Sequence, residues 1–125
     1  MLGEITMPLI ELFKNYRDRY MRSSIEKLEF PDFPPDEERR YQIVFSGRVQ
    51  GVGFRYEAML LAEKLCLTGH VKNLPNGDVY MEVQGPNNKI FHLIHCMESI
   101  PRILIERKII DELSLKEETS FTPIF

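Results

Sequence analysis

Apolar residues in the first part of the chain recur at the spacing of one helical face. This stripe comprises Leu9, Phe13, Tyr16, Tyr20, Met21, Ile25 and Leu28, and charged residues fall mainly on other faces. The pattern predicts an amphipathic helix whose first turn holds Pro8, with Thr6 or Met7 at the cap position. The prolines of residues 31–35 then end the helix, because proline lacks a backbone donor and restricts the residue before it.

After residue 39 the pattern changes to short strands and helices. Residues 41–46 are rich in β-forming side chains and apolar on both faces, as expected of a central strand. Residues 54–65 carry apolar positions at helical spacing. Residues 69–74 and 79–84 then flank a turn that contains Asn-Gly, the strongest short signal for a β-hairpin.

A second helix and two further strand segments complete the pattern. The helix opens at Gly85-Pro86-Asn87 and ends at Ser99-Ile100-Pro101, followed by a β-rich run over residues 103–111. Residues 120–125 form a candidate last strand, which we expect to be short or displaced because Pro123 cannot donate to a ladder. The order β-α-β-β-α-β predicts an α+β fold, a ferredoxin-like sandwich with an antiparallel sheet, plus the N-terminal helix.

Length and composition fit one globular domain with an extension. The chain has 125 residues, of which 43% are hydrophobic and 28% charged. We divide it into residues 1–39, a helical extension with a proline-rich linker, and residues 40–125, the folded domain. The net charge of -3 argues against a general nucleic-acid binder, which normally has a strongly basic surface.

The sequence predicts a cytoplasmic protein without a membrane span. No apolar run approaches the roughly 20 residues that a membrane helix needs, and the N-terminus lacks the pattern of a signal peptide. Cys66 and Cys96 have no metal-type spacing and lie among apolar residues of the predicted helices. We therefore expect both thiols to be reduced and buried.

A glycine-rich loop lies between the first strand of the domain and the helix that follows. Glycine allows close approach to the backbone, so the N–H groups of such a loop can surround an anion beside the helix N-terminus. Arg55, in the first helical turn, can add a fork of donors for two phosphate oxygens. The spacing matches neither a Walker loop nor a dinucleotide fingerprint, so on spacing alone a tight turn and an anion site remain equally open.

The full loop sequence, Gly47-Arg48-Val49-Gln50-Gly51-Val52-Gly53-Phe54-Arg55, closely resembles the signature of the acylphosphatase family. A second signature of that family is present at Gly69-His70-Val71-Lys72-Asn73-Leu74-Pro75-Asn76-Gly77-Asp78-Val79. The resemblance covers residues 40–125 and does not extend to the first 39 residues.

This resemblance implies an enzyme that hydrolyses the carboxyl–phosphate bond of acyl phosphates to carboxylate and inorganic phosphate. It implies no metal and no cofactor, and direct attack of water without a phospho-enzyme. Arg55 would clamp the phosphoryl group, and Asn73 would orient the attacking water. The phosphate would be cradled by the backbone N–H groups of Arg48, Val49, Gln50, Gly51, Val52, Gly53 and Phe54.

Other polar residues carry weaker signals. His92 and His95 are spaced to share a metal on one helix, but the sequence offers no third ligand nearby, and ordinary, partly exposed histidines are favoured. His70 should face away from Asn73 on its strand, in a structural role. We interpret Glu57 as a solvent-facing or a helix-turn residue rather than a base, and residues 36–40 as a solvated linker.

The N-terminal extension leaves a second class of function open. In that interpretation the domain is a non-catalytic phosphate-binding or regulatory module, and the helix recruits a protein partner. Arg55 and Asn73 together argue for activity, because a pure scaffold needs neither. The sequence is compatible with a monomer or with a dimer formed through the helix, with a small acyl phosphate as substrate and no nucleic acid or membrane as partner.

Overall fold

The computed structural model describes the backbone of residues 9–125 and the side chains from Asn15 onward. Two compact units are formed, Met1–Phe30 and Pro31–Phe125. The first contains helix α1 (Leu9–Glu26), which confirms the predicted helix, whereas its predicted cap at Thr6 or Met7 and first-turn Pro8 lie outside the described residues. Tyr16 and Tyr20 of the apolar stripe are exposed.

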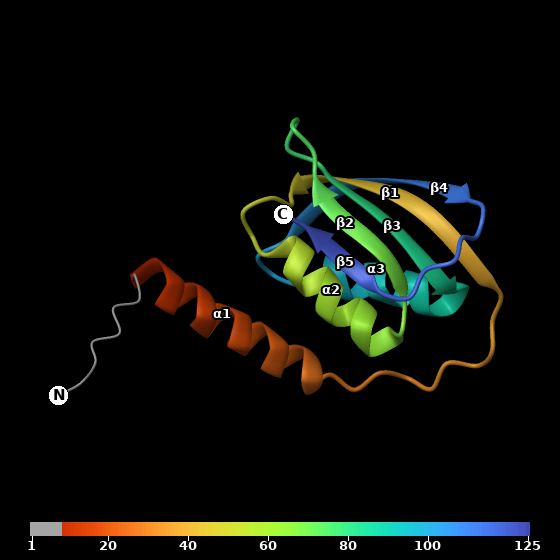
Figure 1. Cartoon of the computed structure of the whole chain (residues 1–125), viewed down its shortest axis with the longest axis horizontal. Helices are drawn as coiled ribbons and strands as arrows, with labels where there is room; N and C mark the ends of the chain where they lie inside the picture. The colour runs from red at the N-terminus through yellow and green to blue at the C-terminus, as the bar shows by residue number, and fades with distance from the viewer. Residues whose placement is uncertain (1–8) are drawn as a thin grey trace. The chain divides into compact units, whose positions relative to one another are not determined.

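The second unit is the predicted α+β fold (Figure 1). Its elements follow the chain in this order: β1 (Glu38–Arg48), α2 (Phe54–Leu65), β2 (Thr68–Asn73), β3 (Val79–Pro86), α3 (Asn87–Glu98), β4 (Leu104–Leu113) and β5 (Phe121–Ile124). The five strands form one sheet in the order β4-β1-β3-β2-β5. This arrangement confirms the ferredoxin-like prediction, with β5 added at one edge.

One face of the sheet and the two helices α2 and α3 form the core. On β1 and β3 the alternate residues of that face are buried, including Ile43, Phe45 and Met81. The helices bury their apolar stripes, with Leu61 on α2 and Leu93 on α3 fully buried. Alternation with period 2 on the strands and 3.6 on the helices thus places a single apolar layer between sheet and helices.

The sheet is mixed rather than wholly antiparallel. β1 pairs antiparallel with β3 and β4, and β2 pairs antiparallel with β3, but β5 runs parallel to β2. Residues 114–120 cross from the β4 edge to the β2 edge at one end of the sheet, so β5 runs opposite to β4 and therefore along β2. The expected short last strand is confirmed, with Pro123 on an edge strand opposite Val71.

A buried arginine holds the crossing segment against the open face of the sheet. Arg40 is 1% exposed, and its guanidinium lies 2.8 Å from Glu82 and 2.7 Å from Glu118. Gln84 accepts a hydrogen bond from Lys116 N and donates one to Lys116 O. The interpretation of residues 36–40 as a solvated linker is therefore wrong for Arg40, because carboxylates brought together by the sheet compensate its charge.

The same cluster shifts the ionisation of two side chains on β3. The Tyr80 hydroxyl donates to Glu82 Oε2 at 2.7 Å, and burial, together with that bond, raises the pKa of Tyr80 to about 12. Burial also acts to raise the pKa of Glu82, but hydrogen bonds from Tyr80 and Arg40 outweigh it, so the net pKa is lowered. Both shifts favour the neutral tyrosine beside an ionised carboxylate.

The segment before β1 is attached to α3. The Pro34 carbonyl accepts from Asn88 Nδ2 at 2.8 Å, and the Asp36 carboxylate accepts from Asn88 N at 2.9 Å. The ring of Phe33 packs edge-on against that of His92. Asp36 thus satisfies a free N–H in the first turn of α3, as a capping carboxylate does, and is not simply part of a solvated linker.

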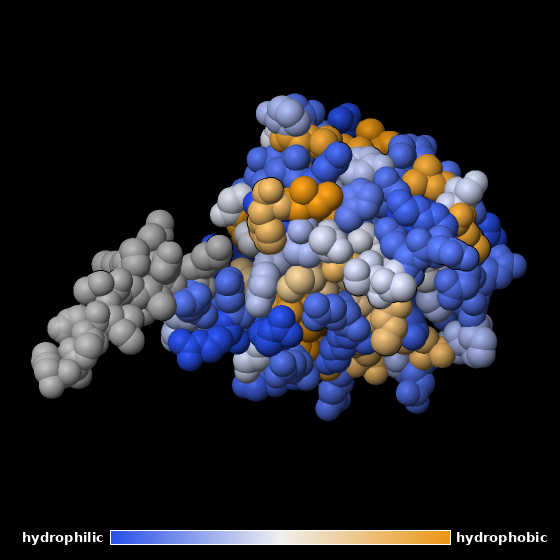
Figure 2. All heavy atoms as spheres, viewed as in Figure 1, coloured by the Kyte–Doolittle hydropathy of each residue, from blue (hydrophilic) through white to orange (hydrophobic). Residues whose placement is uncertain are grey.

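The surface of the second unit is mixed in character. On the face shown in Figure 2, hydrophilic residues separate small hydrophobic patches. Large apolar side chains that are exposed include Leu104 and Ile109 on β4 and Phe125 after β5. Scattered apolar residues of this kind are normal on a folded domain.

Candidate phosphate site

The glycine-rich loop is anchored at both ends by buried side chains. β1 ends at Arg48, residues 49–53 form the loop, and α2 begins at Phe54. Val49 is fully buried and Phe54 is 2% exposed. The Phe54 ring packs 5.1 Å from that of Phe45 on β1. These anchors hold the loop between strand and helix, where the sequence places it.

Two glycines have backbone conformations that other residues adopt only with strain. Gly47 has φ 129°, and a Cβ there would lie 2.2 Å from the carbonyl oxygen of Leu104 on β4. The register of β1 against β4 shifts between Ser46 and Gly47, so the ladder has an irregularity at this point and then continues to Arg48. Gly53, at the N-cap of α2, has φ 78° in the left-handed region.

The start of α2 supplies backbone donors to the loop. The first hydrogen bond of the helix runs from Glu57 N to Gly53 O at 3.0 Å, so the N–H groups of Phe54, Arg55 and Tyr56 precede it. Gly53, the N-cap residue, has no side chain that could accept a hydrogen bond from these N–H groups. These unpaired N–H groups and the positive end of the helix favour an anion in front of the loop.

Arg55 lies in the first turn of α2, and its side chain contacts Ile124 and Phe125. Its Nη1 donates to Ile124 O at 3.0 Å, and its guanidinium carbon lies 4.5 Å from the centre of the Phe125 ring. Arginine has five N–H donors, and this bond uses one of them. The contacts orient the guanidinium and leave donors for an anion.

Asn73, the last residue of β2, lies next to a turn that the loop binds directly. Gln50 Nε2 donates to Leu74 O and to Asp78 O, each at 2.8 Å. The turn itself is closed by a bond from Leu74 N to Asp78 O at 2.9 Å. The sequence predicted a role only for the backbone N–H of Gln50. The structure shows that its side chain also joins the loop to the hairpin.

The end of β5 completes this convergence. Ile124, whose carbonyl binds Arg55, pairs in register with Lys72, the residue before Asn73. The loop, the end of β2 and the end of β5 therefore meet at one end of the sheet. The remaining residues of the predicted phosphate cradle, Arg48 and Gly51 to Phe54, belong to the same loop segment.

His70 lies on the opposite face of β2 from Asn73, as predicted. Its Nε2 is 3.6 Å from Glu82 Oε2, and its ring lies beside that of Tyr80. Lys72, on the same face, has its ammonium 5.4 Å from the centre of the Tyr80 ring. Both side chains thus contact the polar cluster of the open face.

Of the two alternatives for Glu57, the helix-turn position is confirmed, since it lies in the first turn of α2, and the solvent-facing position is wrong. Glu57 is 4% exposed and forms an ion pair with Arg102, which lies between α3 and β4. Arg102 Nε donates at 2.8 Å to the carbonyl oxygen of Val52 in the loop. Glu57 lies three positions after the buried Phe54, on the same side of α2. This spacing was the sequence feature from which its burial could have been predicted. Nothing in the local sequence of Arg102 indicated its role.

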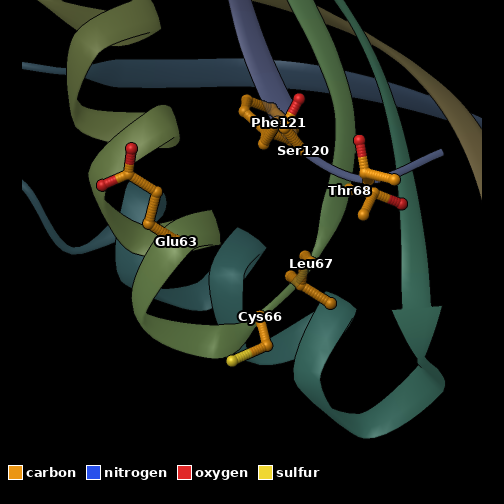
Figure 3. A pocket seen from close by; sticks show the side chains of 7 residues that line it. Glu63, Cys66, Leu67, Thr68, Ser120 and Phe121 are labelled. Carbon is orange, nitrogen blue, oxygen red and sulfur yellow. The ribbon is translucent and has the colours of Figure 1, made fainter.

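A pocket of about 350 Å³ lies at the end of β2 remote from Asn73, since Thr68 is the first residue of that strand. Its lining comes from the end of α2, the start of β2 and the residues that lead into β5 (Figure 3). Cys66, in this lining, is exposed, and the prediction of a buried thiol is wrong for it because it caps α2 in the left-handed region. Cys96 is half-buried, and burial raises the pKa of its thiol.

Within residues 9–125, no group of three or more His, Cys, Asp or Glu side chains is placed to hold a metal ion. Burial lowers the pKa of His92, and the nearby His95 lowers it further. Over the same residues, no helix is long and apolar enough to cross a membrane.

Comparison with known proteins agrees with this geometry. An acylphosphatase from Clostridium beijerinckii is 54% identical over 55 residues, 44% of this chain and 61% of that protein, and one from Bordetella parapertussis is 36% identical over 61% of this chain and 81% of that protein. The crystal structure of acylphosphatase from Bacillus subtilis superposes with a TM-score of 0.66 at 32% identity, covering 70% of this chain and 99% of that one. The acylphosphatase family description matches residues 41–123, and the chain belongs to the acylphosphatase family.

Proposed function

We propose that this chain hydrolyses the carboxyl–phosphate bond of small acyl phosphates, with Arg55 and Asn73 as its catalytic residues. The observation that carries the proposal is the meeting of three segments: Gln50 ties the loop to the turn after Asn73, and Arg55 reaches the end of β5 beside it. The activity is the one by which the relatives are named. The hydrolase class predicted from the sequence is thereby confirmed at the level of the family.

The chemistry proposed for the site is positioning and charge stabilisation. The loop N–H groups and Arg55 hold the phosphoryl oxygens, and they strengthen their hold as charge develops in the transition state. Asn73 orients the attacking water but is neutral, so the proton passes to the substrate itself. The carboxylate is a good leaving group, so the site needs no covalent nucleophile, and the loop carries no Ser, Cys or His.

Release of inorganic phosphate from benzoyl phosphate and acetyl phosphate tests this function. The full chain is assayed with and without EDTA, and the Asn73→Ala variant is assayed beside it. We expect release that persists in EDTA and is lost in the variant. Release that needs an added metal ion, or that is unchanged in Asn73→Ala, would remove the proposed mechanism.

A role for α1 is a separate proposal. We infer that its apolar stripe, which exposes Tyr16 and Tyr20, pairs two copies of the chain. Sedimentation of the full chain should then show a concentration-dependent dimer, and a Tyr16→Glu/Tyr20→Glu variant should be monomeric with unchanged phosphate release. Absence of a dimer, with no phosphate release and capture of a protein through α1, would instead favour the non-catalytic module.

We also place this protein in the cytoplasm and assign it no cofactor. Cys66 and Cys96 are free thiols, as expected in a reducing compartment. Detection of the protein in a membrane or secreted fraction would contradict the localisation.

A further inference from the structure

We propose that Arg102 and Glu57 are positioning residues that lock one peptide of the phosphate loop with its N–H toward the anion. The peptide joins Val52 to Gly53, and its carbonyl oxygen accepts from Arg102 Nε at 2.8 Å. Glu57, 4% exposed on α2, pairs with Nη2 of the same guanidinium. The proposal rests on the function proposed above.

The orientation of this peptide decides whether the loop attracts or repels an anion. The peptide is trans, so its C=O and N–H point in opposite directions. Arg102 holds the carbonyl on its own side, and the N–H of Gly53 therefore points away from Arg102. A flipped peptide would present the carbonyl oxygen in its place, and a carbonyl dipole repels phosphate.

The loop needs such a lock because of its own composition. A peptide flip changes ψ of Val52 and φ of Gly53, and glycine populates φ of either sign almost equally. Gly53 has φ 78° here. Its sterics do not oppose the flip, so a contact from outside the loop can select one orientation.

Glu57 fixes Arg102 in the place where it can act. The N–H of Glu57 donates to Gly53 O, so the carboxylate is tied to the loop through one helical turn. The planar guanidinium donates from Nη2 to the Glu57 carboxylate and from Nε to Val52 O at the same time. An ammonium group cannot make both hydrogen bonds with the same geometry. Arg102 also neutralises a carboxylate that stands two residues from Arg55.

The test compares phosphate binding and turnover of the full chain in the wild type, four variants of Arg102 and Glu57, and one control variant. Glu57→Gln/Arg102→Met removes the lock together with both charges, so no unpaired carboxylate is left buried. Three single variants separate the contributions of the two residues: Arg102→Lys, Arg102→Met and Glu57→Gln. Lys108→Met is the matched control, because it breaks an exposed ion pair with Glu98. The readouts are the Kd for inorganic phosphate, from amide NMR titration, and kcat/KM for benzoyl phosphate.

For the double variant we expect roughly tenfold weaker phosphate binding, the loss of one charge-assisted bond, and loss of the phosphate-induced shift of the Gly53 amide. Arg102→Lys should recover part of the affinity, and Lys108→Met should match the wild type. A double variant with a lower unfolding midpoint but phosphate Kd and Gly53 shift within twofold of the wild type would overturn the proposal. If the wild type binds phosphate without releasing it from benzoyl phosphate, the proposed function fails, and the Kd and amide shift still decide on the lock.

Discussion

Arg55 is held in place before any substrate arrives. Its Nη1 donates to Ile124 O, and the Phe125 ring lies under the guanidinium at 4.5 Å. Ordering a long side chain on binding costs about 0.5–1.5 kcal/mol, so an arginine ordered in advance binds phosphate more tightly. The side chain of Gln50 is also held in place, because its amide group donates hydrogen bonds to two carbonyl oxygens of the hairpin turn.

Asn73 has a role that can be separated from phosphate binding. We predict that Asn73→Ala lowers kcat for benzoyl phosphate by about a hundredfold, a usual loss for a single preorganised polar group in an active site. The inhibition constant of inorganic phosphate should stay within about threefold of the wild type, because the loop and Arg55 are intact. Lys72→Ala, one position earlier and on the opposite face, is the control. An equal rise in the inhibition constant would place Asn73 among the phosphate ligands instead.

At the scale of elements, local patterns predicted what local physics decides. The apolar spacing of residues 54–65 and the Asn-Gly turn predicted α2 and the β2–β3 hairpin, and both are present. The parallel pairing of β5 was not predicted, because a strand pattern names neither partner nor direction. Arg40 was placed in a solvated run for a similar reason: its partners Glu82 and Glu118 lie far away in the sequence.

The candidate site divides in the same way. Arg55, Asn73 and the loop glycines could be proposed as site residues because the two signatures are contiguous strings. The contact of Arg102 with Val52 could not, since it joins residues 50 positions apart and leaves no local pattern. The helix-turn alternative for Glu57 was correct, but the ion pair that accompanies its burial could not be predicted because it depends on that same distant arginine.

The close approach of β1 to β4 at the register shift depends on Gly47. We predict that Gly47→Ala lowers the free energy of unfolding by roughly 3–5 kcal/mol, because left-handed strain and a clash with Leu104 O add together. Gly77→Ala is the matched comparison, since Gly77 also has positive φ but open space around it. That variant should lose about 1–2 kcal/mol. Denaturant unfolding measures both, and equal losses would show that the close approach of β4 does not matter.

At the scale of the whole molecule, the open face of the sheet is organised by charge. Arg40, Glu82 and Glu118 hold residues 114–120 across that face, and these residues lead the chain into β5. β5 in turn carries the carbonyl that orients Arg55. The polar cluster and the phosphate loop are therefore joined through one strand.

This cluster predicts how stability changes at high pH. The pKa of Tyr80 is raised to about 12 in the folded protein, so its contribution to stability is complete below the unfolded value near 10 and is lost as pH rises towards 12. The free energy of unfolding should therefore fall less steeply from pH 10 to 12 in Tyr80→Phe than in the wild type. Identical slopes for Tyr80→Phe and the wild type would contradict the raised pKa.

We propose that the loop from Gly47 to Arg55 binds a phosphoryl group and that Arg55 contributes much of the binding free energy. The most direct test is kcat/KM for benzoyl phosphate in EDTA, measured for the wild type, Arg55→Gln and, as a control, Arg107→Gln on the exposed face of β4. Hydrogen bonds to charged groups are worth about 1.5–3 kcal/mol each, so loss of the two-bond fork predicts at least a hundredfold fall for Arg55→Gln. Arg107→Gln should be unchanged. Near-normal turnover by Arg55→Gln would show that Arg55 does not hold the phosphoryl group.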